Sequence, residues 1–108
     1  ASLATPSRAL LVAESGGRAV GTARLDEQQF GGWTVSITVA PEARGKGHSA
    51  DILRAVEPIA RQRGATYLTA VIKKGNEASV KAFKRAGYYG FAETSDGLLK
   101  CERRLARY

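Results

Sequence analysis

Methionine is absent from this sequence, and cysteine and histidine each occur once. The single cysteine, Cys101, excludes an internal disulfide framework, and one cysteine with one histidine cannot supply the four ligands of a structural zinc site. The sequence therefore predicts no bound metal. It also has no run of about 18 apolar residues and no charged-then-apolar leader, so we expect no membrane span and a cytoplasmic location.

Acidic side chains are few: 10 aspartates and glutamates stand against 17 lysines and arginines, which gives a net charge of +7. A charge of this size suits a polyanionic partner, such as nucleic acid, a membrane surface or a phosphorylated small molecule. No basic run is interleaved with stacking aromatic residues. A solvated basic surface is therefore favoured over nucleic-acid binding.

The chain is 108 residues long and 44% hydrophobic, enough for one core and too short for two. We expect a single domain over residues 1–108. The lack of methionine, together with a strand-like run already at residues 9–15, is compatible with this domain being the C-terminal part of a longer protein.

The first part of the chain reads as three strands. Two short runs, 9–15 and 18–25, are separated by Gly16-Gly17, a dipeptide typical of a two-residue hairpin turn. A third run, WTVSITVA (33–40), alternates, with apolar side chains on one face and hydroxyl side chains on the other. Its apolar face carries Trp33, Val35, Ile37 and Val39.

Helices and strands alternate in the second part. The apolar spacing predicts a helix from Ser49, its expected N-cap, to residue 63, with Gly64 as C-cap. Pro58 predicts a kink or an early end, because an interior proline costs about 3 kcal/mol. The run 66–73 should form a strand parallel to 33–40 through a right-handed crossover.

Asn76 is expected to cap a second helix that Gly87 ends, and the runs 88–93 and 98–105 predict a closing pair of strands around a turn at 95–97. The predicted order is β-β-β-α-β-α-β-β. The fold class is therefore α/β (α+β), with a mixed, mostly antiparallel sheet and a central parallel β-α-β pair.

The loop ARGKGHSAD (43–51) lies between the third strand and the first helix, a place that favours an anion. Gly45 and Gly47 allow the backbone to approach phosphate oxygens closely, and Arg44 and Lys46 add positive charge. The Walker pattern is absent. GKGHSA does fit the dinucleotide fingerprint G-x-G-x-x-A, but lysines 73 and 74 stand where an acidic residue is expected, so nicotinamide binding is a weak alternative.

Two segments together are more specific than the loop alone. VAPEARGKGHSADIL and NEASVKAFKRAGY resemble the acetyl-coenzyme A motifs of the GCN5-related N-acetyltransferase (GNAT) family, over roughly residues 10–105. The family's loop pattern [QR]-x-x-G-x-[GA] is matched by Arg44, Gly45, Lys46, Gly47 and His48, with Ser49 in the last small position. Its later pattern is matched by Asn76, Ser79, Phe83 (one residue beyond strict spacing), Gly87 and Tyr88.

The resemblance implies a GNAT-like sheet in which the strands before the loop and after the helix splay apart, with the pantetheine arm of acetyl-CoA between them. The diphosphate would lie on the N–H groups of residues 44–49, and Asn76 would bond the pantetheine, cap its helix, or both. The expected cofactor-binding residues are Ile37, Thr38, Val39, Arg44, Gly45, Lys46, Gly47, His48, Ser49, Asn76, Ser79 and Phe83. The family's usual N-terminal strand and helices would be missing, which leaves the first strand as an exposed edge and favours a homodimer.

The catalytic residues stay unknown at this level. Phe83 occupies the position of the family's proton-donating tyrosine, and Tyr88 and Tyr89 are expected to be packed strand aromatics. Thr34, Ser36 and Thr38 stand where some relatives carry a carboxylate. Glu42 is expected on the surface, His48 at a phosphate or in solvent, and Cys101 in the core.

Three hypotheses remain. The first is an acetyl-CoA-dependent N-acetyltransferase acting on a primary amine. The second is a non-catalytic acyl-CoA-binding module, favoured by Phe83 and the absent base. The third is a nucleic-acid-binding domain, supported only by the net charge.

Overall fold

The computed structural model describes residues 7–40, 45, 47–73 and 75–105. The elements follow the predicted order: β1 (Arg8–Ser15), β2 (Arg18–Glu27), β3 (Gly32–Val39), α1 (His48–Gln62), β4 (Tyr67–Lys73), α2 (Glu77–Arg85), β5 (Tyr89–Glu93) and β6 (Leu98–Arg104). The strands form one sheet in the order β1-β2-β3-β4-β6-β5. The predicted fold class is confirmed.

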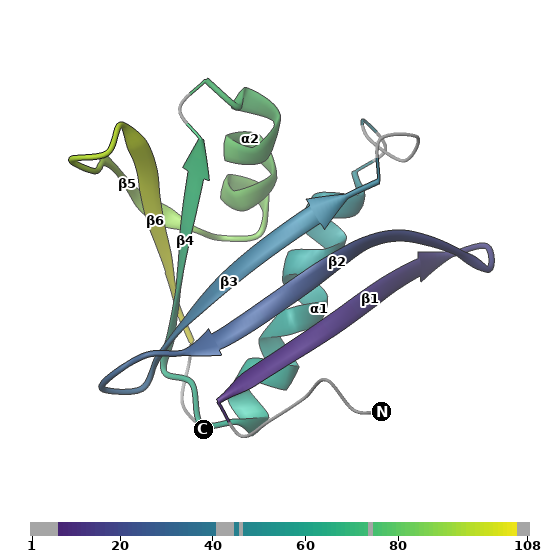
Figure 1. The fold of residues 1–108 in the computed structure, drawn as a ribbon, viewed down its shortest axis with the longest axis horizontal. Helices are drawn as coiled ribbons and strands as arrows, with labels where there is room; N and C mark the ends of the chain where they lie inside the picture. Colours follow the sequence, from purple (N-terminus) through teal and green to yellow (C-terminus); the bar gives the residue numbers. More distant parts are fainter. Residues whose placement is uncertain (1–6, 41–44, 46, 74, 106–108) are drawn as a thin grey trace.

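The sheet is antiparallel except at its centre, where β3 and β4 run parallel. The crossover through α1 makes them parallel, as the alternation of strand and helix requires. Both helices pack on one face of the sheet, and β1 and β5 form its two edges (Figure 1). The second face carries no helix among the described residues.

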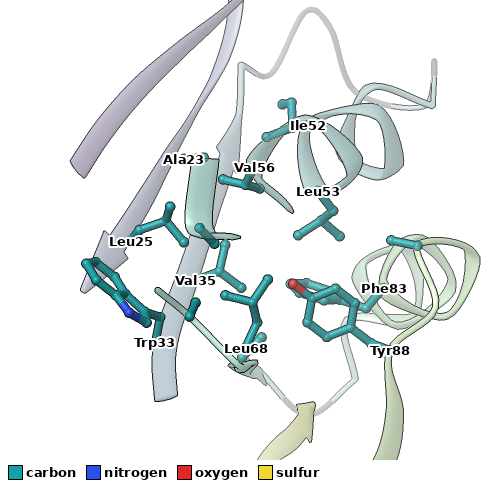
Figure 2. Close-up of a cluster of buried hydrophobic side chains, with 14 of the residues drawn as sticks. Ala23, Leu25, Trp33, Val35, Ile52, Leu53, Val56, Leu68, Phe83 and Tyr88 are labelled. Atoms are coloured by element: carbon teal, nitrogen blue, oxygen red, sulfur yellow. The ribbon is translucent and has the colours of Figure 1, made fainter. Parts of the chain in front are cut away.

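The buried side chains gather between this face and the helices (Figure 2). The alternation predicted for residues 33–40 is confirmed, because Trp33 and Val35 are buried while Ser36 is exposed. The largest side chains that are almost fully buried come from β2, β3, α1, β4 and β6: Leu25, Trp33, Leu53, Val56, Leu68 and Cys101. Apolar burial between one sheet face and two helices is the main source of stability in such a two-layer fold.

The structure corrects the predicted N-cap of α1 and excludes the early end that was one of the two expectations at Pro58. Its N-cap is Gly47, in the left-handed conformation, and Ser49 is the second residue of the helix and does not cap it. The helix does not end at Pro58 but continues to Gln62. Pro58 is exposed, whereas Val56 and Ala60 are buried against the sheet, so packing of the neighbouring turns outweighs the cost of the missing hydrogen bond.

Both helices end in the same way. After α1, the Gly64 N–H donates to the Arg61 carbonyl at 3.0 Å and the Ala65 N–H donates to the Ala60 carbonyl at 3.0 Å. Gly64 has φ 87° and follows the C-cap residue Arg63, so this is a Schellman motif, which needs a left-handed residue at that position.

In α2 the same motif places two aromatic rings together. The Tyr88 N–H donates to the Phe83 carbonyl at 2.9 Å, and the two rings meet edge to face at a centroid distance of 4.9 Å. Tyr88 is buried as predicted, and Figure 2 shows its ring beside Phe83 in the core. Tyr89 is 45% exposed, so the prediction that it is a packed aromatic is wrong.

A partly buried ion pair ties α1 to β6. Arg103 donates through Nε to a carboxylate oxygen of Glu57 at 2.9 Å, and Arg61 lies 3.9 Å from the other oxygen. The Arg103 guanidinium also covers Gly87, where a Cβ atom would lie 2.6 Å from Nη1. Only glycine therefore fits at the end of α2 with this arginine in place.

No described helix is long and apolar enough to cross a membrane.

The buried thiol makes stability depend on pH. Burial raises the pKa of the Cys101 thiol from 9.0 to about 11, so the folded chain keeps a proton that the unfolded chain releases. The stabilisation is complete below about pH 9 and is lost as the pH rises through 11. We expect the free energy of unfolding to fall by about 2 kcal/mol across this window, measured by denaturant titration.

Cys101→Ala is the control for this measurement, because it removes the thiol and should flatten the pH profile between 9 and 10. Burial also raises the pKa of Tyr88, whose contribution begins only above its ordinary value of 10.0. An equal fall in the alanine variant would assign the effect to other groups.

Candidate functional site

The site begins where the two parallel strands separate. β3 and β4 pair only over Gly32–Thr34 and Tyr67–Thr69, and beyond that point they diverge toward their C-terminal ends (Figure 1). The even-numbered residues of β3 form the backbone hydrogen bonds to β2. The Ala40 N–H donates to the Val20 carbonyl, and the Gln28 N–H donates to the Gly32 carbonyl. The backbone groups of Ile37 therefore point across the gap and have no strand partner among the described residues.

A cleft of about 340 Å³ opens at the wide end of this gap. Four segments meet there: the end of β3, the loop before α1, the first turn of α1 and the first turn of α2. The lining residues are Ile37, Thr38, Val39, Gly45, Gly47, His48, Ser49, Asn76, Ala78 and Ser79.

The two glycines of the loop keep the cleft open on one side. Gly45 has φ 79° and Gly47 has φ 80°, a conformation that glycine adopts at little cost. A Cβ atom at either position would meet no protein atom within 4 Å. Packing inside the protein therefore does not require these glycines, and a side chain at either position would project into open space at the loop.

The cleft also lies at the start of both helices. α1 has no side-chain cap at Gly47, and the residues that the structure describes offer no other side-chain cap to the N–H groups of its first turn. α2 starts at the same cleft, and the dipoles of both helices place positive potential there. Lys73, the last residue of β4, is exposed and stands shortly before α2 in the sequence. This arrangement favours a phosphate-bearing ligand.

The side-chain amide of Asn76 has an acceptor, Oδ1, and a donor, Nδ2, and the two lie in different surroundings. Its Oδ1 accepts a hydrogen bond from the Ser79 N–H at 3.2 Å, which confirms the predicted N-cap of α2. Its Nδ2 has no partner among the described residues, and the side chain lies in the wall of the cleft. The same residue can therefore cap the helix and donate a hydrogen bond to a ligand.

The structure brings nine of the twelve predicted cofactor-binding residues together around the cleft. Arg44 and Lys46 lie outside the described residues, as does Glu42. Phe83 does not line the cleft, because its ring is 3% exposed and packs in the core. Ala78 lines it but carries no chemical signal in the sequence, since alanine in a first helical turn is ordinary.

A second depression of about 730 Å³ lies on the face of the sheet without helices. It is lined by Thr34 and Thr69, the last paired residues of β3 and β4, and by Glu102 of β6. It therefore borders the point at which the strands begin to separate. Sequence reasoning missed Glu102, because only the pairing of β4 with β6 places it opposite Thr69.

The described residues do not support a metal site or an exposed thiol. No three histidine, cysteine or acidic side chains gather there as a metal site would require. Cys101 is buried, which confirms that it is a core residue.

Comparison with solved structures gives the same architecture. The GNAT domain of S. lividans PAT superposes with a TM-score of 0.82 at 27% identity, covering 92% of this chain and 61% of that one. The ribosomal-protein-alanine N-acetyltransferase from Brucella melitensis gives a TM-score of 0.73 at 30% identity, covering 89% and 68%. This chain thus spans less than two thirds of the length of the S. lividans domain.

A more distant structure shares the fold at lower identity. The aminoglycoside acetyltransferase AAC(6′)-Ib, solved in complex with coenzyme A, gives a TM-score of 0.76 at 17% identity, covering 92% of this chain and 67% of that one. In sequence, residues 2–88 match the acetyltransferase (GNAT) family, which is most of the chain. The chain therefore belongs to the acetyltransferase (GNAT) family.

Proposed function

We propose that the chain is an acetyl-CoA-dependent N-acetyltransferase that transfers an acetyl group to a primary amine. The proposal rests on one observation: the gap between β3 and β4 opens into a cleft whose surroundings favour an anion. Ile37 offers backbone groups that have no strand partner in the described part of the chain, and the cleft at the wide end of the gap brings together two helix N-termini and two open glycines. The related structures, an N-acetyltransferase and an acetyltransferase solved in complex with coenzyme A, support this assignment.

The residues fit the two ends of the cofactor differently. The pantetheine arm carries amides, which pair with a strand edge as a peptide does, and the backbone of Ile37 supplies such an edge. The diphosphate carries negative charge, which the N–H groups of His48 and Ser49 and the positive helix ends stabilise. The open space at Gly45 and Gly47 leaves room for its oxygens.

The acceptor amine would approach from the other face of the sheet. The depression beside Thr34 and Thr69 borders the narrow end of the gap, and Glu102 in its wall can attract a cationic amine. Attack on the thioester carbonyl requires the neutral amine, so a proton must leave it before or during the attack. Glu102, directly or through water, is the carboxylate placed to receive that proton.

At the family's position for the proton donor to the departing thiolate, the described residues offer no hydroxyl. Phe83 stands at the family's tyrosine position and has no hydroxyl, and the Tyr88 hydroxyl is buried without a hydrogen-bond partner in the core. A non-catalytic acyl-CoA-binding module is therefore the second candidate function. It predicts the same cleft and the same ligand but no acetyl transfer.

Further expectations belong to this proposal. They comprise a single acetyltransferase-like domain over residues 1–108, a cytoplasmic location and a homodimer. The amine acceptors named for relatives, a ribosomal-protein alanine and aminoglycosides, support an amine as acceptor without naming the one used here. Nucleic-acid binding rests only on the net charge of +7 and ranks last.

The decisive experiment combines binding with turnover. The chain is titrated with acetyl-CoA, with NADPH as the control ligand, and release of the free thiol is then followed with a panel of primary amines. We expect acetyl-CoA alone to raise the thermal midpoint, since a ligand at a hundred times its Kd adds about 2.7 kcal/mol of stability. Binding with amine-dependent thiol release supports the transferase, and binding without release supports the second candidate.

The loop glycines allow a matched comparison. Gly47 and Gly64 flank α1, both have positive φ, and neither would place a Cβ against protein atoms. Gly47→Ala and Gly64→Ala should therefore each cost about 1 kcal/mol of stability. Only Gly47→Ala should weaken acetyl-CoA binding, by about tenfold or more in Kd measured by calorimetry. Equal affinities in the two variants would contradict the assignment of the loop.

Asn76 separates capping from ligand binding. Asn76→Ser keeps an oxygen that can cap α2 but removes the Nδ2 donor, whereas Asn76→Ala removes both. We expect the alanine variant to lose about 1 kcal/mol of stability and the serine variant to keep most of it. Both should bind acetyl-CoA more weakly than the native chain. A serine variant of native affinity would show that Asn76 serves only as a cap.

A further inference from the structure

We propose that the acceptor of this chain is a small primary amine that has one positive charge and carries an aromatic group. The inference rests on the proposed acetyltransferase activity and gives the chemical class of its acceptor. Phe30 and Tyr67 would hold the aromatic group, and Glu102 would hold the amine. All three residues line the depression of about 730 Å³ that borders the narrow end of the gap between β3 and β4.

The turn between β2 and β3 has an unusual backbone conformation at Phe30. Phe30 has φ 59°, and within the described ranges it is the only residue other than glycine with a positive φ. The Gly32 N–H donates to the Gln29 carbonyl at 3.1 Å, which closes a turn with Phe30 and Gly31 at its centre. Because both central residues have positive φ, this is a type I′ turn. Asparagine and glycine form such a turn easily, whereas a bulky aromatic residue is strained there.

Packing within the described part of the chain does not offset this strain. The side chain of Phe30 is 92% exposed, so its ring gains little from contact with the described residues. Backbone strain of this kind is concentrated at active sites and at residues that hold a ligand. The ring lines the depression, and we therefore assign Phe30 to the binding of the molecule that enters it.

Tyr67 provides a second aromatic ring in the same depression. It is the first residue of β4 and pairs with Gly32 of β3. A Cβ atom at Gly32 would lie 2.6 Å from both Cζ and the hydroxyl oxygen of Tyr67, so the outer end of this ring rests on the Gly32 backbone. The absence of a side chain at Gly32 therefore lets the Tyr67 ring lie next to the turn that carries Phe30.

Glu102 is the acidic residue in the wall of this depression. Its carboxylate forms no ion pair or hydrogen bond with another residue that the structure describes, so it can pair with a cationic ligand. Glu102 lies opposite Thr69, and Tyr67 is its diagonal neighbour on the same face of the sheet. Diagonal neighbours are about 7 to 8 Å apart, a distance that a small amine with an aromatic ring can span.

Lys100 limits the positive charge that the acceptor can carry. It lines the same depression and precedes Glu102 by two residues on β6, so both side chains lie on the same face. A monoamine would pair with Glu102, whereas each further positive charge of a polyamine would meet the ammonium group of Lys100. The described wall therefore favours a singly charged amine whose remaining part is flat and uncharged, because such a group stacks on aromatic rings.

Acetyl transfer to three amines tests this class of acceptor. The full chain is mixed with acetyl-CoA and with 2-phenylethylamine, butylamine or spermidine, and release of the free thiol is followed. We expect kcat/KM for 2-phenylethylamine to exceed the other two values by about tenfold, because this amine alone combines one charge with an aromatic ring. Equal values for all three would overturn this inference and leave the acetyltransferase standing. Transfer to no amine would overturn both.

Substitution of Phe30 separates ligand binding from a structural role. Phe30→Asn removes the ring and suits the left-handed turn, so the thermal midpoint should stay the same or rise. KM for 2-phenylethylamine should rise by about tenfold in this variant, while kcat/KM for butylamine stays unchanged. Phe30→Tyr keeps a ring and should retain the native preference. A native KM in Phe30→Asn would overturn the proposal, and a lowered midpoint with it would assign Phe30 to packing against protein.

Discussion

The cleft between the helix starts exists because β3 and β4 separate early. Their parallel ladder lasts for three residue pairs and then stops. A parallel pair that continued would bond the backbone groups of Ile37 within the sheet and leave nothing for a ligand. Beyond this point the sheet consists of two halves, β1-β2-β3 and β4-β6-β5, which the β3–β4 ladder no longer joins. Contacts of the helices with the strands and with each other connect them.

The first turns of both helices border the cleft at the wide end of the gap and place positive potential there. α1 packs on β2 and β3, and α2 packs on α1, while both begin at the wide end of the gap. The ion pair of Glu57 with Arg103 connects α1 to β6 across the divergence. Breaking one partner of such a partly buried pair leaves a charge without compensation, so this contact supports the geometry of the cleft from a distance.

The two faces of the sheet differ in what covers them, and its two edges differ in length and regularity. One face is covered by helices and holds the core, and the other is open and borders the narrow end of the gap beside Thr34 and Thr69. The β5 edge is short and irregular, whereas the β1 edge is long, regular and apolar at its centre.

The order of elements, the hairpin, the parallel crossover and most residues of the cleft could be predicted from the sequence, because alternation, helical spacing and glycine chemistry are local properties. Tertiary structure decided the rest. Pro58 lies inside a continuing helix because its neighbouring turns are buried, and Ser49 does not cap because Gly47 adopts the left-handed turn first. Glu102 reaches the open depression only through strand pairing, and the end of the β3–β4 ladder after three residue pairs is also a long-range feature that no local pattern encodes.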